Sequence, residues 1–194
     1  MGSERKDTAT RQEEILEASL HIIHEEGQSK LTVRNIADRI GISEPAVYRH
    51  FDSKEEIVRR LAEKLFSADL LDMNPSNFGE PEDLLNDLLS SVFESIEENP
   101  HVTSFLFDDE LFAEYPEVEQ KFLKHRSEKR EQLSGMIEAG QEQGFIDDEA
   151  DPETAALVLM GGIWMTVREW REKGFDEPLE NQAEDLAAEL SRML

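Results

Sequence analysis

The chain has 194 residues, enough for one good-sized domain or two small ones, and 38% of them are hydrophobic, which is adequate for a core. Its lack of cysteine excludes disulfide bonds and thiolate-bound zinc. Asp and Glu outnumber Lys and Arg by 45 to 20, a net charge of −25 that is typical of proteins from a salt-rich cytoplasm and also of acid-rich proteins of ordinary origin.

No segment of the sequence predicts a membrane span or a secretory signal. The longest apolar run, Ala155 to Val167, is too short to cross a bilayer comfortably. The first eleven residues, MGSERKDTATR, lack the apolar stretch of a signal peptide. We therefore expect a soluble, cytoplasmic protein.

Hydrophobic periodicity is helical along almost the whole chain, and no alternating strand pattern occurs. Four helices are expected early in the chain: about Thr10–Glu26, one capped by Thr32, one capped by Ser43, and one that begins after Asp52-Ser53. Gly27 and Gly41 are the expected stops of the first two helices. Pro45 lies in the first turn of the third helix, where its missing N–H costs nothing.

After Leu71 the segment DMNPSNFGEPED is rich in turn formers and is the one clear linker. Five further helices are expected, punctuated by prolines, at about Pro81–Glu98, His101–Ala113, Pro116–Gln143, Pro152–Lys173 and Glu177–Met193. The predicted fold class is therefore all-α, with about nine helices.

The two short helices that meet at Gly41-Ile42-Ser43 have the pattern of a helix-turn-helix, whose second helix enters the major groove of DNA with its N-terminus first. Gly41 supplies the turn, and Ile36, Ile42 and Val47 are expected to pack the helices together. The outward side chains of the second helix are then available to DNA.

The segment LTVRNIADRIGISEPAVYRHFDSKEEI, residues 31–57, resembles the N-terminal signature of the tetracycline-repressor (TetR) family of transcriptional regulators. The shared features are the Thr-x-Arg opening, the Ile-Ala pair, the Gly-hydrophobic-Ser turn, the Tyr-x-His-Phe end and the Ser-Lys-Glu start of the next helix. The preceding RQEEILEASLHIIHEEG matches the family's first helix, so the resemblance covers about Ala9 to Asp69.

The resemblance implies a three-helix DNA-binding domain at residues 9–69, with the helix-turn-helix at 32–51. A fourth helix joins it to a C-terminal helical domain at 70–194 for ligand binding and dimerisation. The implied function is a ligand-responsive repressor that binds a pseudo-palindromic operator as a homodimer. An alternative is a regulator of the same family without a small-molecule effector, controlled by a protein partner or by salt.

The resemblance also implies which side chains contact DNA. Residues with donors suited to phosphate oxygens are Thr32, Arg34, Ser43, Tyr48, His50 and Lys54, and Arg34 is also within reach of a base. Residues expected at base edges are Glu44, Pro45, Ala46 and Arg49. Arginine binds guanine in a bidentate way, alanine packs on a thymine methyl, and glutamate accepts from cytosine. Alternatively, Glu44 complements the dipole at a helix N-terminus.

Charge divides unevenly along the chain. Residues 1–66 carry a net charge of −2, and the remaining 128 residues carry −23. We expect the anionic second region to face away from DNA, with phosphate contacts made mainly by Arg34, Arg49 and Lys54. Six such contacts per dimer give a log–log salt slope of roughly −5, which is shallower than for a basic repressor.

Aromatic side chains gather where the resembled family encloses its ligand. The candidates for the wall of a cavity are Phe105, Phe107, Phe112 and Trp164, and core packing is the alternative for each. The segment KFLKHRSEKR, residues 121–130, holds five of the nine bases of the second region. It is able to bind the anionic head of a ligand such as an acyl-CoA, although pairs at i,i+4 spacing favour a solvated face.

The run AALVLMGGIWM, residues 155–165, is apolar all round, and its two glycines indicate close approach of another backbone. In the resembled family the last two helices pair with their copies. Gly161, Gly162, Leu186 and Leu190 are therefore dimer-interface candidates, and a helix fully buried within a monomer is the competing interpretation.

The carboxylates form no recognisable catalytic pattern. No Ser/His/Asp order, phosphate loop or EF-hand loop occurs, so we expect no enzyme, no cofactor and no metal. The expected partners are double-stranded operator DNA, a second copy of the chain and a small hydrophobic effector, with no membrane.

Overall fold

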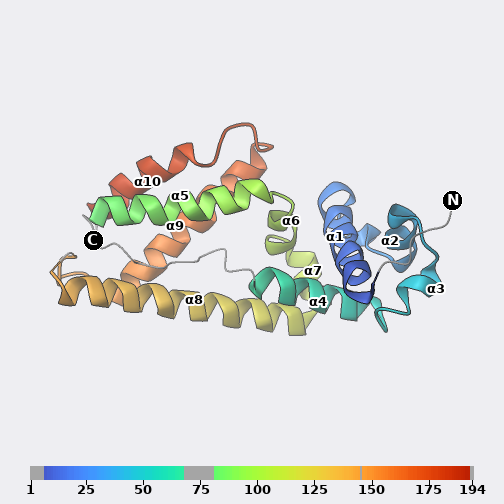
Figure 1. The fold of residues 1–194 in the computed structure, drawn as a ribbon. Coiled ribbons are helices and arrows are strands. Elements are labelled where there is room, and N and C mark those ends of the chain that lie inside the picture. The colour runs from blue at the N-terminus through green and yellow to red at the C-terminus, as the bar shows by residue number, and fades with distance from the viewer. Residues whose placement is uncertain (1–6, 68–80, 145, 193–194) are drawn as a thin grey trace. The chain divides into compact units, whose positions relative to one another are not determined.

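The computed structural model describes residues 7–67, 81–144 and 146–192, and these form ten α-helices and one short 3-10 helix without any strand (Figure 1). The chain divides into two compact units. One comprises Met1–Ala68 and Ser104–Phe122, and the other comprises Asp69–Thr103 and Leu123–Leu194. The linker expected after Leu71 and the domain boundary expected at residues 69–70 lie outside the described residues.

The first unit begins with the helices of the predicted DNA-binding domain. They are α1 (Thr8–Glu26), η1 (Gln28–Lys30), α2 (Val33–Ile40), α3 (Glu44–Val47) and α4 (Lys54–Ser67). The helix α1 starts where the Asp7 carboxylate accepts from the Thr10 N–H at 2.8 Å and ends at Gly27, as expected. It packs against α2 and α4 and buries Ile15 and Ile22 completely.

Segment 104–122 joins this first unit, although it was expected in the second domain. It contains most of α6 (Val102–Leu106), all of α7 (Asp109–Glu114) and the start of α8 (Pro116–Glu142). The expectation of one helix over His101–Ala113 is wrong. The Asp108 carboxylate accepts from the Leu111 N–H at 2.8 Å, and this cap begins a new helix.

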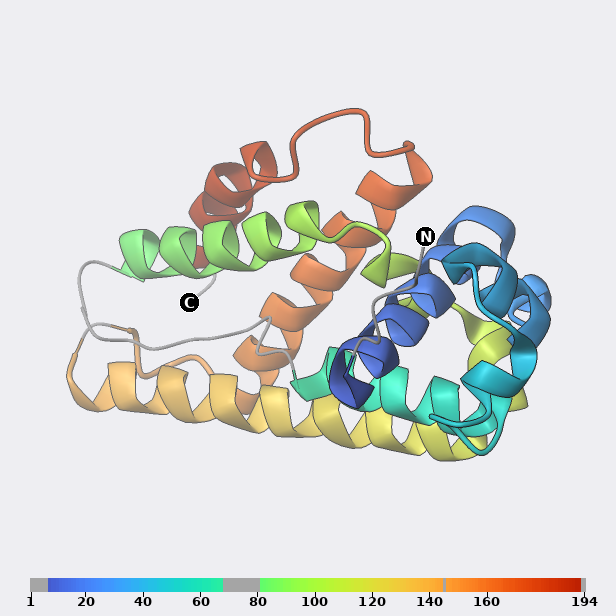
Figure 2. The same ribbon diagram turned by 45° about the vertical axis from the view of Figure 1, so that its right-hand side comes forward.

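The second unit contains α5 (Pro81–Glu98), the rest of α8, α9 (Pro152–Glu172) and α10 (Asn181–Ser191). The helix α10 lies along α5 in both views (Figures 1 and 2). Leu89 and Phe93 of α5 and Ala187 of α10 are buried in this unit. The last helix starts at Asn181 and not at Glu177, because the Trp170 indole N–H donates to the Glu177 carbonyl at 2.7 Å and holds that segment as a loop.

Among the helices of the described residues, none is both long enough and apolar enough to cross a membrane.

Candidate nucleic-acid interface

The turn between α2 and α3 is built by local hydrogen bonds. The Thr32 hydroxyl accepts from the Asn35 N–H at 3.1 Å and caps α2, as expected. Gly41 ends α2 in the left-handed conformation, with φ 71°, and the Ile42 N–H donates to the Ala37 carbonyl at 3.0 Å. Ser43 then occupies the N-cap position of α3, but its hydroxyl makes no capping hydrogen bond.

Gly41 makes this turn sensitive to substitution. An added Cβ would meet no atom within 4 Å, so the cost of Gly41→Ala is backbone strain alone. We expect it to lower the free energy of unfolding by roughly 1 kcal/mol, as measured by urea denaturation followed by circular dichroism. Gly135→Ala is the control, because Gly135 lies in α8 with equally open space and should gain stability instead. Equal effects at both glycines would contradict this account.

The second helix of the motif is short. The helix α3 is a single turn, and Tyr48, Arg49 and His50 continue it as hydrogen-bonded turns. The N–H groups of His50 and Phe51 both donate to the Val47 carbonyl, at 2.9 and 3.2 Å. Val47 and Phe51 are buried, so they anchor both ends of this segment against the rest of the unit.

The predicted DNA contacts differ in exposure. Those with exposed side chains are Thr32, Arg34, Ser43, Glu44, Pro45, Tyr48 and Arg49, and Ala46, His50 and Lys54 are half-buried. The Nδ1 atom of His50 is buried without a hydrogen-bond partner in the described structure, so donation to a phosphate falls to the other ring nitrogen. The motif thus presents a mixed polar surface that begins at the α2 cap and ends at α4.

The cations of this surface are unequally paired. The Arg34 guanidinium lies 3.8 Å from the Asp38 carboxylate, and both side chains are exposed. The Lys54 ammonium lies 2.9 Å from the Glu114 carboxylate. Arg49 has no ion-pair partner among the residues that the structure describes. Arg49 is therefore the cation that DNA can engage without breaking a contact in the protein.

Elsewhere in the first unit, the Lys and Arg side chains mainly form ion pairs with carboxylates of the same unit. Arg39 pairs with Glu25, Lys64 pairs with Glu13, and Glu63 receives both Arg59 at 2.8 Å and Lys121 at 2.6 Å. The hydrogen bond from Lys121 is the main reason that the pKa of Glu63 lies below its usual value. Lys121 thus pairs across the unit and not along its own helix.

The aromatic residues predicted as a ligand wall lie in two places. Phe105 and Phe112 are buried in the first unit, with ring centroids 6.1 Å apart, and they share contacts with two further rings, those of Phe66 and Phe122. Such edge and stacked contacts are usual for a packed core. Phe107 and Trp164 are half-buried. The role of these four in a ligand cavity stays a prediction.

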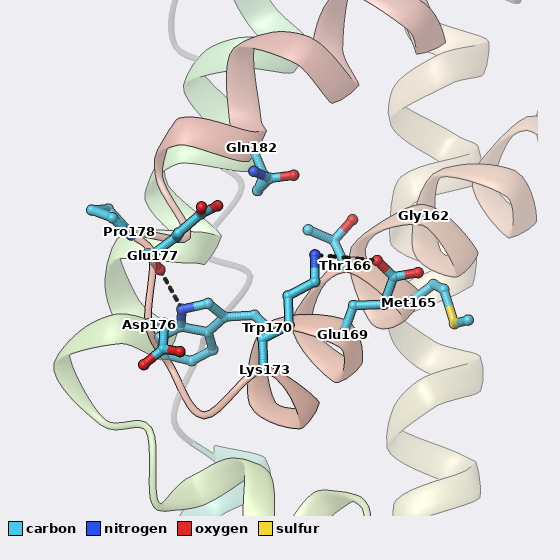
Figure 3. A pocket seen from close by; sticks show the side chains of 10 residues that line it. All are labelled: Gly162, Met165, Thr166, Glu169, Trp170, Lys173, Asp176, Glu177, Pro178 and Gln182. Atoms are coloured by element: carbon cyan, nitrogen blue, oxygen red, sulfur yellow. Dashed lines mark hydrogen bonds and ion pairs between the residues drawn. The ribbon is translucent and has the colours of Figure 1, made fainter.

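A cleft of about 410 Å³ lies in the second unit between the end of α9 and the start of α10 (Figure 3). Its wall includes the Trp170 ring, and Met165 and Gly162 line it from the preceding turns of α9. The Lys173 ammonium lies 3.9 Å from the Glu169 carboxylate at the same cleft. None of the four predicted wall residues lines it.

The four residues predicted for the dimer interface differ in their exposure. Leu190 is buried within its own unit, and a Cβ on Gly162 would meet Leu186 of α10 at 3.4 Å, so these two positions face each other within the chain. Gly161 is exposed. The apolar side chains exposed near Gly161 are Leu157, Val158 and Met165. All three belong to the apolar run 155–165 on which the predicted interface rests, and their spacing with Gly161 places them on one helical face.

One charged side chain lies on the inner face of α8. Lys129 is only 8% exposed, in register with buried Leu133 and Ile137 one and two turns later. By contrast, the side chain of Lys124 is 78% exposed and pairs with Glu128 at 3.5 Å, as the i,i+4 pattern indicated. Burying an ammonium is costly unless a polar or anionic group accompanies it, so Lys129 marks a polar spot inside the second unit.

Comparison with known proteins gives a consistent set of relatives. The family model for "Bacterial regulatory proteins, tetR family" matches residues 15–61. The HTH-type transcriptional repressor KstR2 of Rhodococcus jostii (strain RHA1) is 30% identical over 175 residues, which are 84% of this chain and 81% of that protein.

Two solved structures have the same fold over nearly the whole chain. A TetR transcription regulator from Haloarcula marismortui has a TM-score of 0.74 at 26% identity, covering 96% of this chain and 98% of the other. The ketosteroid transcriptional regulator KstR2 of Mycobacterium tuberculosis has a TM-score of 0.72 at 25% identity, covering 98% of this chain and 95% of the other.

Proposed function

Since the chain belongs to the tetR family of bacterial regulatory proteins and is a DNA-binding transcriptional regulator, we propose that it acts in the cytoplasm as a ligand-responsive repressor that binds a pseudo-palindromic operator as a homodimer. The observation that carries the proposal is the helix-turn-helix itself. A capped α2 and a glycine turn hold α3 so that Glu44, Pro45 and Arg49 face outward. Outward groups at the start of the second helix are those that reach base edges in the major groove.

The homodimer is supported by the outer face of α9. The side chains of Leu157 and Met165 are 56% and 55% exposed, and Val158 is 39% exposed, on a face that carries Gly161 between them. Met165 also lines the cleft beside α10, so the apolar face continues into a hollow. A contiguous exposed apolar face of this kind is typical of a protein interface. The same face on a second copy is the proposed occupant.

The effector is proposed to be an apolar molecule that carries an anionic group. Lys129 supports this, since a buried ammonium on the inner face of α8 attracts an anion more strongly than an exposed one would. A ligand that binds best to a conformation with the wrong spacing between the two reading helices releases DNA by linkage.

Lys129→Met tests the effector proposal. We expect it to leave operator binding intact and to raise the concentration of oleoyl-CoA or oleate needed for release by about 10- to 100-fold, the usual loss for a hydrogen bond to a charged group. The uncharged oleyl alcohol serves as the probe without an anion, and Lys124→Met is the control variant because Lys124 is exposed on the same helix. Equal shifts for both variants in a fluorescence-anisotropy release assay would argue against Lys129 as the anion's partner.

The repressor proposal is tested by selecting fragments of the source genome with purified protein and footprinting the bound sites. We expect two inverted half-sites with centres about 34–36 Å apart, one turn of DNA. Selection of DNA without any shared sequence would contradict the proposal. A specific operator that responds to none of a broad set of small molecules would instead favour control by a protein partner or by salt.

A further inference from the structure

Lys54, the first residue of α4, is held by the protein itself. Its Nζ donates to Glu114 Oε1 at 2.9 Å and lies 5.4 Å from the centre of the Tyr115 ring. The Tyr115 hydroxyl donates to the same carboxylate oxygen, also at 2.9 Å. All three residues belong to the first unit, in which α7 lies beside α4 (Figures 1 and 2). The ammonium is thus attracted by a carboxylate and by an aromatic face together.

Of the two partners of Lys54, Tyr115 is held in place more firmly than Lys54 itself. Tyr115 is only 3% exposed, its N–H donates to the Leu111 carbonyl at 3.0 Å, and its own carbonyl accepts from the Val118 N–H at 2.9 Å. These hydrogen bonds fix Tyr115 at the corner where α7 ends and α8 begins. The Lys54 side chain is 29% exposed on a flexible four-carbon stem, so it can leave this corner without disturbing it.

Both members of the ion pair are charged near neutral pH. Burial lowers the pKa of Lys54, but hydrogen bonds with Tyr115 and Glu114 outweigh burial and leave that pKa above its usual value. The hydrogen bond from Lys54, followed by that from Tyr115, lowers the pKa of Glu114. An approaching phosphate therefore meets an ammonium that already has an ionised partner.

We propose that Glu114 and Tyr115 are positioning residues that hold Lys54 while DNA is absent, so that operator phosphate must displace a carboxylate to gain this contact. The inference rests on the proposed function, because it takes Lys54 as a phosphate contact. Arg49 needs no such exchange, and the exposed 3.8 Å pair of Arg34 with Asp38 competes less. As a result, operator affinity and its salt dependence are both lower than they would be if Lys54 had no carboxylate partner.

Glu114→Gln tests the competition, because it removes the charge and keeps an acceptor for the Tyr115 hydroxyl. We expect operator affinity in low potassium chloride to rise roughly 2- to 30-fold per dimer, the range for losing one exposed competing ion pair in each subunit. The log–log salt slope should steepen by up to about 2 per dimer. Glu117→Gln is the matched control, since this exposed carboxylate on α8 changes the net charge equally without pairing to Lys54.

Two further variants separate a direct effect on Lys54 from a general one. Tyr115→Phe deletes the hydroxyl and keeps the ring, so it should raise operator affinity by a smaller factor in the same direction. In a Lys54→Ala background, Glu114→Gln should tighten binding no more than Glu117→Gln does. Melting temperatures within a few degrees of wild type establish that each variant is folded.

The inference is overturned if Glu114→Gln and Glu117→Gln behave alike in the wild-type background, or if Lys54→Ala leaves affinity and salt slope unchanged. In either case, specific operator binding by the wild type and its loss on Arg49→Ala would leave the proposed function standing. A wild-type protein that selects no specific DNA overturns the proposed function itself, and this inference with it.

Discussion

Arg49→Ala lowers operator affinity by about 30-fold to 10⁴-fold and relaxes the preference at one base pair in each half-site. This range corresponds to one bidentate arginine–guanine contact per subunit, at about 1–3 kcal/mol each. Arg49 is exposed, lies two residues after α3, and has no ion-pair partner in the described structure that could hold it back. Its full charge and both of its donor edges are thus available to a base.

Affinity measured against a set of operators with single base changes checks this expectation. Lys54→Ala should weaken binding to every operator by a similar factor, because a phosphate contact carries no sequence information. Arg60→Ala is the control for loss of charge, since Arg60 is exposed on α4 beyond the helix-turn-helix and lies 3.8 Å from Glu63. An Arg49→Ala protein that loses affinity equally on all operators would identify Arg49 as a phosphate contact.

Met165→Glu converts the protein into a monomer at micromolar concentration and lowers operator affinity about a thousandfold or more. The carboxylate would enter the apolar face of α9, where the proposed second copy would cover Leu157, Val158 and Met165, and an unpaired buried charge is strongly unfavourable. A monomer contacts a single half-site, so most of the difference between specific and non-specific binding is lost.

Light scattering in high salt gives the mass, and anisotropy gives the operator affinity. Leu123→Glu is the matched control, because Leu123 is an apolar side chain of α8 that is 42% exposed and lies outside the α9 face. We expect that variant to remain dimeric. A wild-type protein that is already monomeric under these conditions, or a Met165→Glu protein that stays dimeric, would remove the α9 face from the interface.

Part of the acidic second region of the sequence lies in the same unit as the helix-turn-helix. All but −2 of the net charge of −25 lies after residue 66 in the sequence, and we expected this anionic region to face away from DNA. Segment 104–122 nevertheless belongs to the same unit as the helix-turn-helix, and its Glu114 reaches Lys54. Under the proposed competition for Lys54, acidic groups reduce DNA affinity by direct pairing as well as by net charge, and this agrees with the shallow salt slope that we predict.

Sequence patterns that span only a few residues predicted most of the secondary structure and the helix-turn-helix. The bounds of α5 agree with the prediction, and the Thr32 cap and the Gly41 turn are confirmed because their hydrogen bonds join residues only three to five positions apart. The two misjudged segments have equally local causes. The Asp108 cap and the Trp170–Glu177 hydrogen bond each interrupt a helical pattern that the side-chain periodicity alone would have continued.

The sequence by itself determined that this protein is an all-helical, DNA-binding regulator, since helix periodicity and the helix-turn-helix signature depend on neighbours within one or two turns. The tertiary structure alone decided which charges and apolar side chains remain available. Glu114 lies 60 residues from Lys54, and Leu186 lies 24 residues from Gly162, so no spacing rule links them. Such pairs arise when helices pack against one another. Packing buries one face of each helix and leaves another face exposed, as it does for Leu157 and Met165 on α9.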